Sequence, residues 1–127
     1  MEKTIFISGD HAGFYLKKKI IYFLKNKGYD VEDCGPFEFN KNDDYPDFVF
    51  PLAKKVVSTK SKGIIIAGSG QGEIIAANKV RGARAVLFYG EHPKILKVSR
   101  EHNDSNILAI GARFVSEEKA KQAIIVW

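Results

Sequence analysis

Cysteine is almost absent from this sequence, and that absence excludes several kinds of protein. Cys34 is the only cysteine among 127 residues, so neither an internal disulfide nor a CxxC metal site can form. The apolar runs are far too short to span a bilayer, and the N-terminal residues lack a signal-peptide pattern. We therefore expect one globular domain over residues 1–127, located in the cytoplasm, with no membrane partner.

Motifs of nucleic-acid-binding proteins are also missing, although the net charge is +5. Most of the cations are lysines on or beside expected helices, as at residues 17–19, which indicates a solvated surface. No helix-turn-helix and no motif of interleaved basic and aromatic residues accompanies them, so we expect no nucleic-acid partner. The arginines are better phosphate ligands, because a guanidinium group binds phosphate through two hydrogen bonds. They are Arg81, Arg84, Arg100 and Arg113.

Short apolar segments alternate with segments of helical periodicity along the chain. The expected strands cover residues 4–7, 29–33, 63–67, 83–88 and 106–110. Helices are expected from residue 14 to a stop at Gly28, from Pro46 onward, after residue 72, over 93–101 and after Ser116. Strands that are short and apolar on both faces are typical of a parallel sheet between two layers of helices.

A glycine turn between the third strand and its helix is the most informative segment. It consists of Gly68, Ser69, Gly70, Gln71, Gly72 and Glu73. Such a turn exposes backbone N–H groups at a helix N-terminus and so favours an anion. No Gly-Lys-Ser/Thr follows, which excludes a Walker A loop, and the acidic ribose partner of a dinucleotide site is missing.

Glu73 places a carboxylate beside these N–H groups, which indicates proton transfer and not only anion binding. A glutamate with an ordinary pKa of about 4.3 is a weak base, so this role requires a desolvated carboxyl group. Two plainer interpretations stay open at this point. The turn could be a tight connection without a ligand, and Glu73 could merely stabilise the helix dipole.

Further polar residues follow other expected strands. Asp10 and His11 come after the first strand and Arg113 comes after the last, so the parallel sheet would gather them in one cleft. Asp10 could instead cap the following helix, and Tyr45 could either line a pocket or belong to a helix start. His102 lies in an expected loop near the cleft, where it could shuttle protons or simply be solvated.

Five segments, in order over nearly the whole chain, resemble the type B ribose-5-phosphate isomerases and the related galactose-6-phosphate isomerase subunits. They are SGDHAGF at 8–14, DYPD at 44–47, GSGQGEIIAANK at 68–79, SREHND at 99–104 and GAR at 111–113. The resemblance implies a three-layer Rossmann-like α/β fold with a five-stranded parallel sheet. It also implies a homodimer or homotetramer with shared active sites, and an aldose–ketose isomerase that needs no metal and no cofactor. Many members have a cysteine base just before the turn; Ala67 excludes it here, and Glu73 matches the branch with a glutamate.

The resemblance also implies a role for each matching residue in the interconversion of ribose 5-phosphate and ribulose 5-phosphate. Glu73 would carry the proton between C1 and C2 of the open-chain sugar. Ser69 and the turn around Gly68, Gly70, Gln71 and Gly72 would hold the enediolate oxygen. The remaining roles are ring opening by His102 of the neighbouring subunit, hydroxyl binding by Asp10 and Asn103, phosphate binding by His11 and Arg113, and a pocket wall formed by Tyr45.

Two other functions stay open. Similar enzymes carry further phosphate-binding arginines in a C-terminal tail, whereas this sequence has no arginine after Arg113. That difference leaves a six-carbon substrate of the galactose-6-phosphate or allose-6-phosphate type as one alternative. The other is a non-catalytic phosphate- or nucleotide-binding module of flavodoxin-like shape, for which the carboxylate of Glu73 would serve no purpose.

Overall fold

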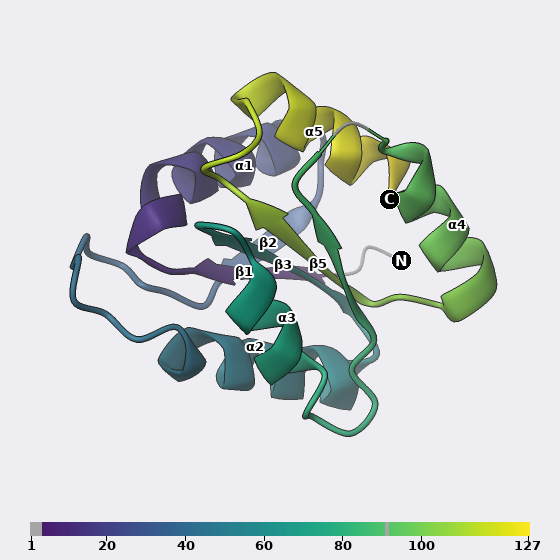
Figure 1. Cartoon of the computed structure of the whole chain (residues 1–127), viewed down its shortest axis with the longest axis horizontal. Coiled ribbons are helices and arrows are strands. Elements are labelled where there is room, and N and C mark those ends of the chain that lie inside the picture. Colours follow the sequence, from purple (N-terminus) through teal and green to yellow (C-terminus); the bar gives the residue numbers. More distant parts are fainter. Residues whose placement is uncertain (1–3, 91) are drawn as a thin grey trace.

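The computed structural model describes residues 4–90 and 92–127. In chain order its elements are β1 (Thr4–Gly9), η1 (His11–Gly13), α1 (Phe14–Asn26), β2 (Asp30–Asp33), α2 (Pro46–Thr59), β3 (Lys62–Ala67), α3 (Gln71–Ala77), β4 (Ala85–Phe88), α4 (Lys94–Asn103), β5 (Ile107–Gly111) and α5 (Glu117–Val126) (Figure 1). No helix in this part of the chain combines the length and the apolarity that a membrane crossing requires.

The strands form one parallel sheet in the order β2-β1-β3-β5-β4. This confirms the expected α/β fold with a five-stranded parallel sheet. β3 lies in the centre, with Gly9 of β1 paired to Ile66 and Gly111 of β5 paired to Ala67. The carboxyl ends of β1, β3 and β5 are therefore adjacent at one edge of the sheet, where ligands of such folds bind.

Helices cover both faces of the sheet. Figure 1 shows α1 and α5 on one face and α2 and α3 on the other. Successive side chains of a strand point to opposite faces, so Ile64 and Ile66 pack with the first pair of helices and Ile65 packs with the second. All three isoleucines are at most 1% exposed. This two-sided burial explains why the central strand has an uninterrupted apolar sequence.

Element boundaries differ from the expected ones at two places that matter. β4 begins at Ala85 and not at residue 83, because the N–H of Arg84 donates to the side chain of Asn106 at 2.7 Å. α4 continues beyond residue 101 to Asn103 and ends at Asp104, which has a left-handed backbone with φ 49°. Residues 102 and 103 are therefore helical, whereas the sequence predicted a loop.

Candidate active site

The glycine turn joins β3 to α3 with a left-handed residue at its centre. Gly70 has φ 85°, and a Cβ atom there would also collide with Cδ1 of Leu87, so only glycine fits. The Ser69 hydroxyl accepts a hydrogen bond from the N–H of Gln71 at 3.2 Å. The N–H of Gly72 lies in the first turn of α3 and has no acceptor within the helix.

Glu73 lies in the first turn of α3 and is only 4% exposed. Burial is the largest cause that raises its pKa, from 4.5 to about 7. A hydrogen bond with the Asp10 carboxyl group and the negative charges of Asp10 and Asp43 act in the same direction. The structure thus provides the desolvation that the sequence argument requires of a general base.

Asp10 is held beside Glu73 by the close contact between the end of β1 and β3. A Cβ atom at Gly9 or Gly13 would collide with the carbonyl oxygen of Ile66, so two glycines allow this approach. The carboxylate of Asp10 accepts hydrogen bonds from the N–H groups of Ala12 at 2.9 Å and Gly13 at 3.3 Å. It therefore caps η1, as the plainer interpretation proposed, and it also contacts Glu73.

Arg113 follows β5 and lies over the glycine turn. Its backbone N–H donates to the carbonyl oxygen of Gly68 at 3.1 Å. Its Nη1 atom lies 3.4 Å from the position that a Cβ atom of Gly68 would occupy. Within the described residues no carboxylate pairs with this guanidinium group. Arg113 is therefore free to bind an anion beside the turn.

Tyr45 lies on the opposite flank of the turn, at the start of α2. A Cβ atom at Gly72 would be 2.8 Å from Cζ of the Tyr45 ring and 3.0 Å from its hydroxyl oxygen. The ring therefore lies directly against the residue that precedes Glu73. The role of Tyr45 as a pocket wall stays a prediction, and this contact with the turn is consistent with it.

His11 is paired with Asp43, a residue that sequence reasoning did not select. Nδ1 of His11 lies 2.9 Å from Oδ1 of Asp43, and the backbone N–H of His11 donates to the same oxygen at 3.2 Å. The sequence gives only a weak indication of this pairing, because Asp43 stands at the end of a polar irregular segment beside the Asp44–Tyr45 motif. Only the fold brings this loop next to the end of β1.

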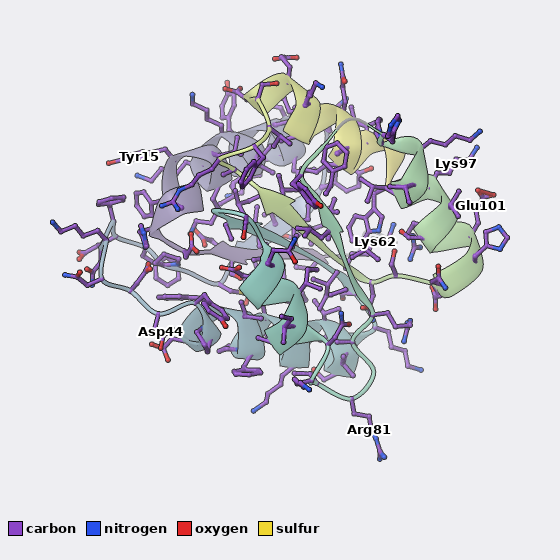
Figure 2. All side chains as sticks on the ribbon, in the orientation of Figure 1. Tyr15, Asp44, Lys62, Arg81, Lys97 and Glu101 are labelled. Atoms are coloured by element: carbon purple, nitrogen blue, oxygen red, sulfur yellow. The ribbon has the colours of Figure 1, made fainter. Side chains whose placement is uncertain are left out.

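His102 and Asn103 lie away from the glycine turn of their own chain, so the expectation of a loop near the cleft at His102 is wrong. They end α4, which precedes the start of β5, and this position lies at the amino edge of the sheet. β5 has five residues, which separates the two edges by about 16 Å. Figure 2 shows Glu101, the neighbour of His102, on the side of the molecule opposite Asp44 and Tyr15.

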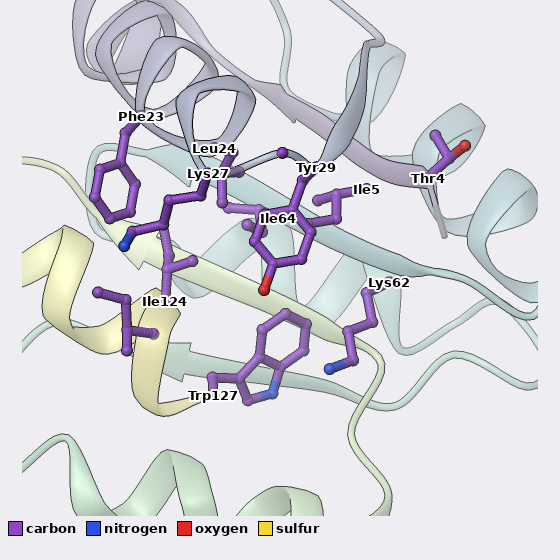
Figure 3. A pocket seen from close by; sticks show the side chains of 12 residues that line it. Thr4, Ile5, Phe23, Leu24, Lys27, Tyr29, Lys62, Ile64, Ile124 and Trp127 are labelled. Carbon is purple, nitrogen blue, oxygen red and sulfur yellow. The ribbon is translucent and has the colours of Figure 1, made fainter. Parts of the chain in front are cut away.

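A cavity of about 650 Å³ lies at the amino edge, between the ends of α1 and α5 and the beginnings of β1 and β3 (Figure 3). Tyr29 and Trp127 line it, and the Nζ atom of Lys62 lies 5.4 Å from the centre of the Trp127 ring. None of its described lining residues is an aspartate, a glutamate or a histidine. This lining includes no carboxylate or imidazole base, whereas Glu73, Asp10, Asp43 and His11 bring such groups together at the carboxyl edge of the sheet.

Metal ligands do not converge in this cleft. Over residues 4–90 and 92–127, no group of three or more histidine, cysteine, aspartate or glutamate side chains has the arrangement of a metal site. The arrangement at the cleft is a buried carboxyl group beside N–H donors and a free guanidinium group. It can move a proton on a small anionic molecule.

Comparisons with known proteins agree with this description. A family model described as Ribose/Galactose Isomerase matches residues 5–127. A probable ribose-5-phosphate isomerase B of Mycoplasma genitalium is 46% identical over 121 residues, which are 94% of this chain and 78% of the relative. The ribose-5-phosphate isomerase B of Mycobacterium tuberculosis strain H37Rv is 43% identical over 110 residues, covering 86% of this chain and 67% of the relative.

Two solved structures have the same fold. The crystal structure of ribose-5-phosphate isomerase B from Mycoplasma genitalium with bound ribulose-5-phosphate superposes with a TM-score of 0.91 at 41% identity, over 97% of this chain and 81% of that one. The ribose-5-phosphate isomerase B of Clostridium thermocellum gives 0.90 at 44% identity, over 98% and 82%. The chain described here therefore belongs to the ribose/galactose isomerase family, among the relatives of the type B ribose-5-phosphate isomerases.

Proposed function

We propose that this protein interconverts ribose 5-phosphate and ribulose 5-phosphate, with Glu73 as the general base. The observation that carries this proposal is the buried carboxyl group of Glu73, whose pKa is raised to about 7 beside an anion-binding turn. A base with a pKa near the working pH is ionised often enough to act and still binds a proton firmly. The names of the relatives, which include a complex with ribulose-5-phosphate, support the choice of substrate.

The reaction needs one proton to move between neighbouring carbons. The Glu73 carboxylate removes the proton from C2 of the open-chain aldose, and the electrons of the C–H bond form the enediolate. The same carboxyl group then returns the proton to C1 while the hydroxyl proton of O2 passes to O1, which gives the ketose. Negative charge on the enediolate oxygen is stabilised by the N–H of Gly72 and its neighbours in the turn, together with the Ser69 hydroxyl.

Binding of the substrate is assigned to the residues around this base. Arg113, which has no carboxylate partner among the described residues, binds the phosphate together with His11. Asp10 accepts a hydrogen bond from a sugar hydroxyl while it contacts Glu73. Tyr45 forms a wall of the pocket by its contact with Gly72.

A second copy of the chain completes the site in this proposal. His102 and Asn103 are exposed at the amino edge and cannot approach Glu73 of their own chain. A homodimer, or a homotetramer built from such dimers, lets these two residues enter the cleft of the neighbour. His102 would then open the sugar ring, and Asn103 would bind a hydroxyl group.

A coupled isomerase assay tests the proposal. Purified protein should convert ribose 5-phosphate to ribulose 5-phosphate, and addition of EDTA should leave the rate unchanged. Glu73→Gln keeps the size of the side chain and removes the base, so activity should fall by at least about 100-fold. Full activity of this variant would exclude Glu73 as the base, and a preference for six-carbon aldose phosphates in the same assay would replace the proposed substrate.

A further inference from the structure

The carboxylate of Asp43 belongs to no expected motif, yet it is buried beside His11. Its side chain is only 6% exposed. One oxygen, Oδ1, accepts hydrogen bonds from both the backbone N–H and the ring Nδ1 of His11. The loop fixes this geometry, because the N–H of Asp43 donates to the carbonyl oxygen of Asn40 at 3.0 Å. A single carboxylate oxygen thus holds the imidazole in one orientation.

The other oxygen of Asp43 is unusual. Oδ2 is buried and has no hydrogen-bond partner in the described part of the chain. A buried polar atom without a partner destabilises a fold, so carboxylates that serve stability alone normally bond through both oxygens. The carboxylate with one unpartnered oxygen points to a role of Asp43 in orienting His11.

The pairing decides which ring nitrogen of His11 meets a ligand. Nδ1 faces Asp43, and Nε2 has no hydrogen-bond partner within the described residues. The side chain is still 29% exposed, so a ligand can reach it. Phe39 contacts the ring edge-on, with centroids 6.3 Å apart, and stacks in turn on Tyr15 at 5.7 Å. The imidazole is therefore held from two sides, with Nε2 as its free nitrogen.

We propose that Asp43 is a positioning residue for phosphate binding: it accepts from Nδ1–H of His11, so that Nε2–H of the protonated ring donates to a phosphate oxygen of the substrate. This inference rests on the proposed function for its substrate, but the bond between the two residues can be tested without any reaction. Carboxylates orient histidines in the same way at metal and catalytic sites, where one ring nitrogen bonds to the carboxylate and the other binds the ligand or transfers a proton.

The charge of Asp43 and its hold on His11 predict opposite effects on phosphate affinity. Asp43 is an anion close to a site for another anion, so on its own it repels a phosphate group. If Asp43 acted only through this charge, Asp43→Asn would tighten phosphate binding. If it acts by holding His11, Asp43→Asn should weaken phosphate binding although it removes a negative charge. An asparagine accepts the backbone N–H of His11 through a neutral oxygen, so the loop is expected to keep its shape. Its bond to the ring N–H is no longer charge-assisted and therefore holds His11 less firmly.

The first experiment measures the ring of His11 directly. The chain has three histidines, so their ¹⁵N NMR signals can be resolved and His11 assigned by comparison with His11→Gln. In the neutral ring of the unmodified protein, the proton should reside on Nδ1, because this nitrogen donates to Asp43. Asp43→Ala should lose this tautomer preference. Titration with inorganic phosphate should shift the Nε2 signal in the unmodified protein and less so in Asp43→Ala.

The second experiment uses enzyme kinetics. Asp43→Asn should raise KM for ribose 5-phosphate and the inhibition constant of inorganic phosphate by about tenfold, with a much smaller change in kcat. Combined with His11→Gln, Asp43→Asn should cause no further rise in KM or in the inhibition constant of phosphate, because its effect on phosphate binding passes through that ring. Asp47→Asn, an exposed aspartate four residues along, is the matched control and should leave KM unchanged.

Several results would overturn the proposal. Tighter phosphate binding by Asp43→Asn would reduce the role of Asp43 to its charge. If Asp43→Asn weakened phosphate binding equally in the unmodified protein and in His11→Gln, Asp43 would act by a route other than His11. A proton on Nε2 of neutral His11 in the unmodified protein would refute the orientation itself, whether or not the protein is an isomerase. Absence of isomerase activity with an intact Nδ1 tautomer would instead contradict only the proposed substrate.

Discussion

The suitability of Glu73 as a base depends on the pKa of its carboxyl group, which its surroundings raise. Burial is the largest cause of the rise to about 7, and the Asp10 carboxyl group is the next. A glutamate with the ordinary value of 4.5 would be ionised at neutral pH but would hold a proton too weakly for this step. The neighbouring carboxyl group therefore helps to make Glu73 a base of suitable strength.

The pH dependence of the rate follows from this pKa. The base must be ionised to act, so kcat/KM should fall as the pH drops below about 7. Asp10→Asn removes a negative charge and a hydrogen bond that both raise the pKa of Glu73. The acid limb of the profile should therefore move to lower pH in this variant, although its maximal rate is reduced by the lost hydroxyl contact. An unmoved acid limb would show that another group controls the profile.

Stability should depend on the same proton. Because the pKa of Glu73 is raised in the fold, the native state binds the proton more tightly than the unfolded chain. This contribution is fully present below pH 4.5 and is lost as the pH rises through about 7. Glu73→Gln removes the penalty at high pH and should raise the free energy of unfolding at pH 8 by up to about 3 kcal/mol. Urea unfolding at pH 4 and pH 8 measures this, and equal differences at the two pH values would contradict it.

The turn between β3 and α3 is packed against the start of α2, so a change in the turn moves side chains of the site. Tyr45 of the α2 start packs on Gly72, so a methyl group on residue 72 must displace the ring. Alanine favours a helix over glycine by up to about 1 kcal/mol, which offsets part of the cost of this displacement. Gly72→Ala should therefore fold with nearly unchanged stability, but bind the substrate several-fold more weakly.

A matched glycine separates these two effects of Gly72→Ala. Gly90 has no heavy atom within 4 Å of the position of an added Cβ, so Gly90→Ala should leave KM unchanged. Thermal unfolding and steady-state kinetics of both variants give the comparison. If Gly72→Ala kept the KM of the unmodified protein, Tyr45 would not be a wall of the pocket.

The elements most accurately predicted from the sequence are those whose residues are buried on both faces. The central strand, with Ile64, Ile65 and Ile66, was identified with an error of one residue, because an uninterrupted apolar run bounded by glycine has few other interpretations. The end of α4 was wrong because His102 and Asn103 are polar and exposed, so local composition does not separate a helix from a loop. Asp43 was missed because its contact with His11 joins residues 32 positions apart.

Topology sets the largest constraint on the molecule. The parallel sheet gathers Asp10, Glu73 and Arg113 at its carboxyl edge and leaves His102 at the amino edge of the same chain. Rotation of side chains does not bridge a separation of about 16 Å. If both Glu73 and His102 take part in the reaction, the active site has to be built from two chains, and the protein cannot work as a monomer.

Mixed dimers test this consequence. Glu73→Gln and His102→Ala should each be nearly inactive as pure proteins. A mixed dimer contains one site in which both residues are intact and one in which both are replaced. After random exchange of subunits about half of the dimers are mixed, so the mixture should recover about a quarter of the original activity. A mixture that stays as inactive as its components would show that each chain supplies its own histidine, and full activity of pure His102→Ala would show that His102 has no part in the reaction.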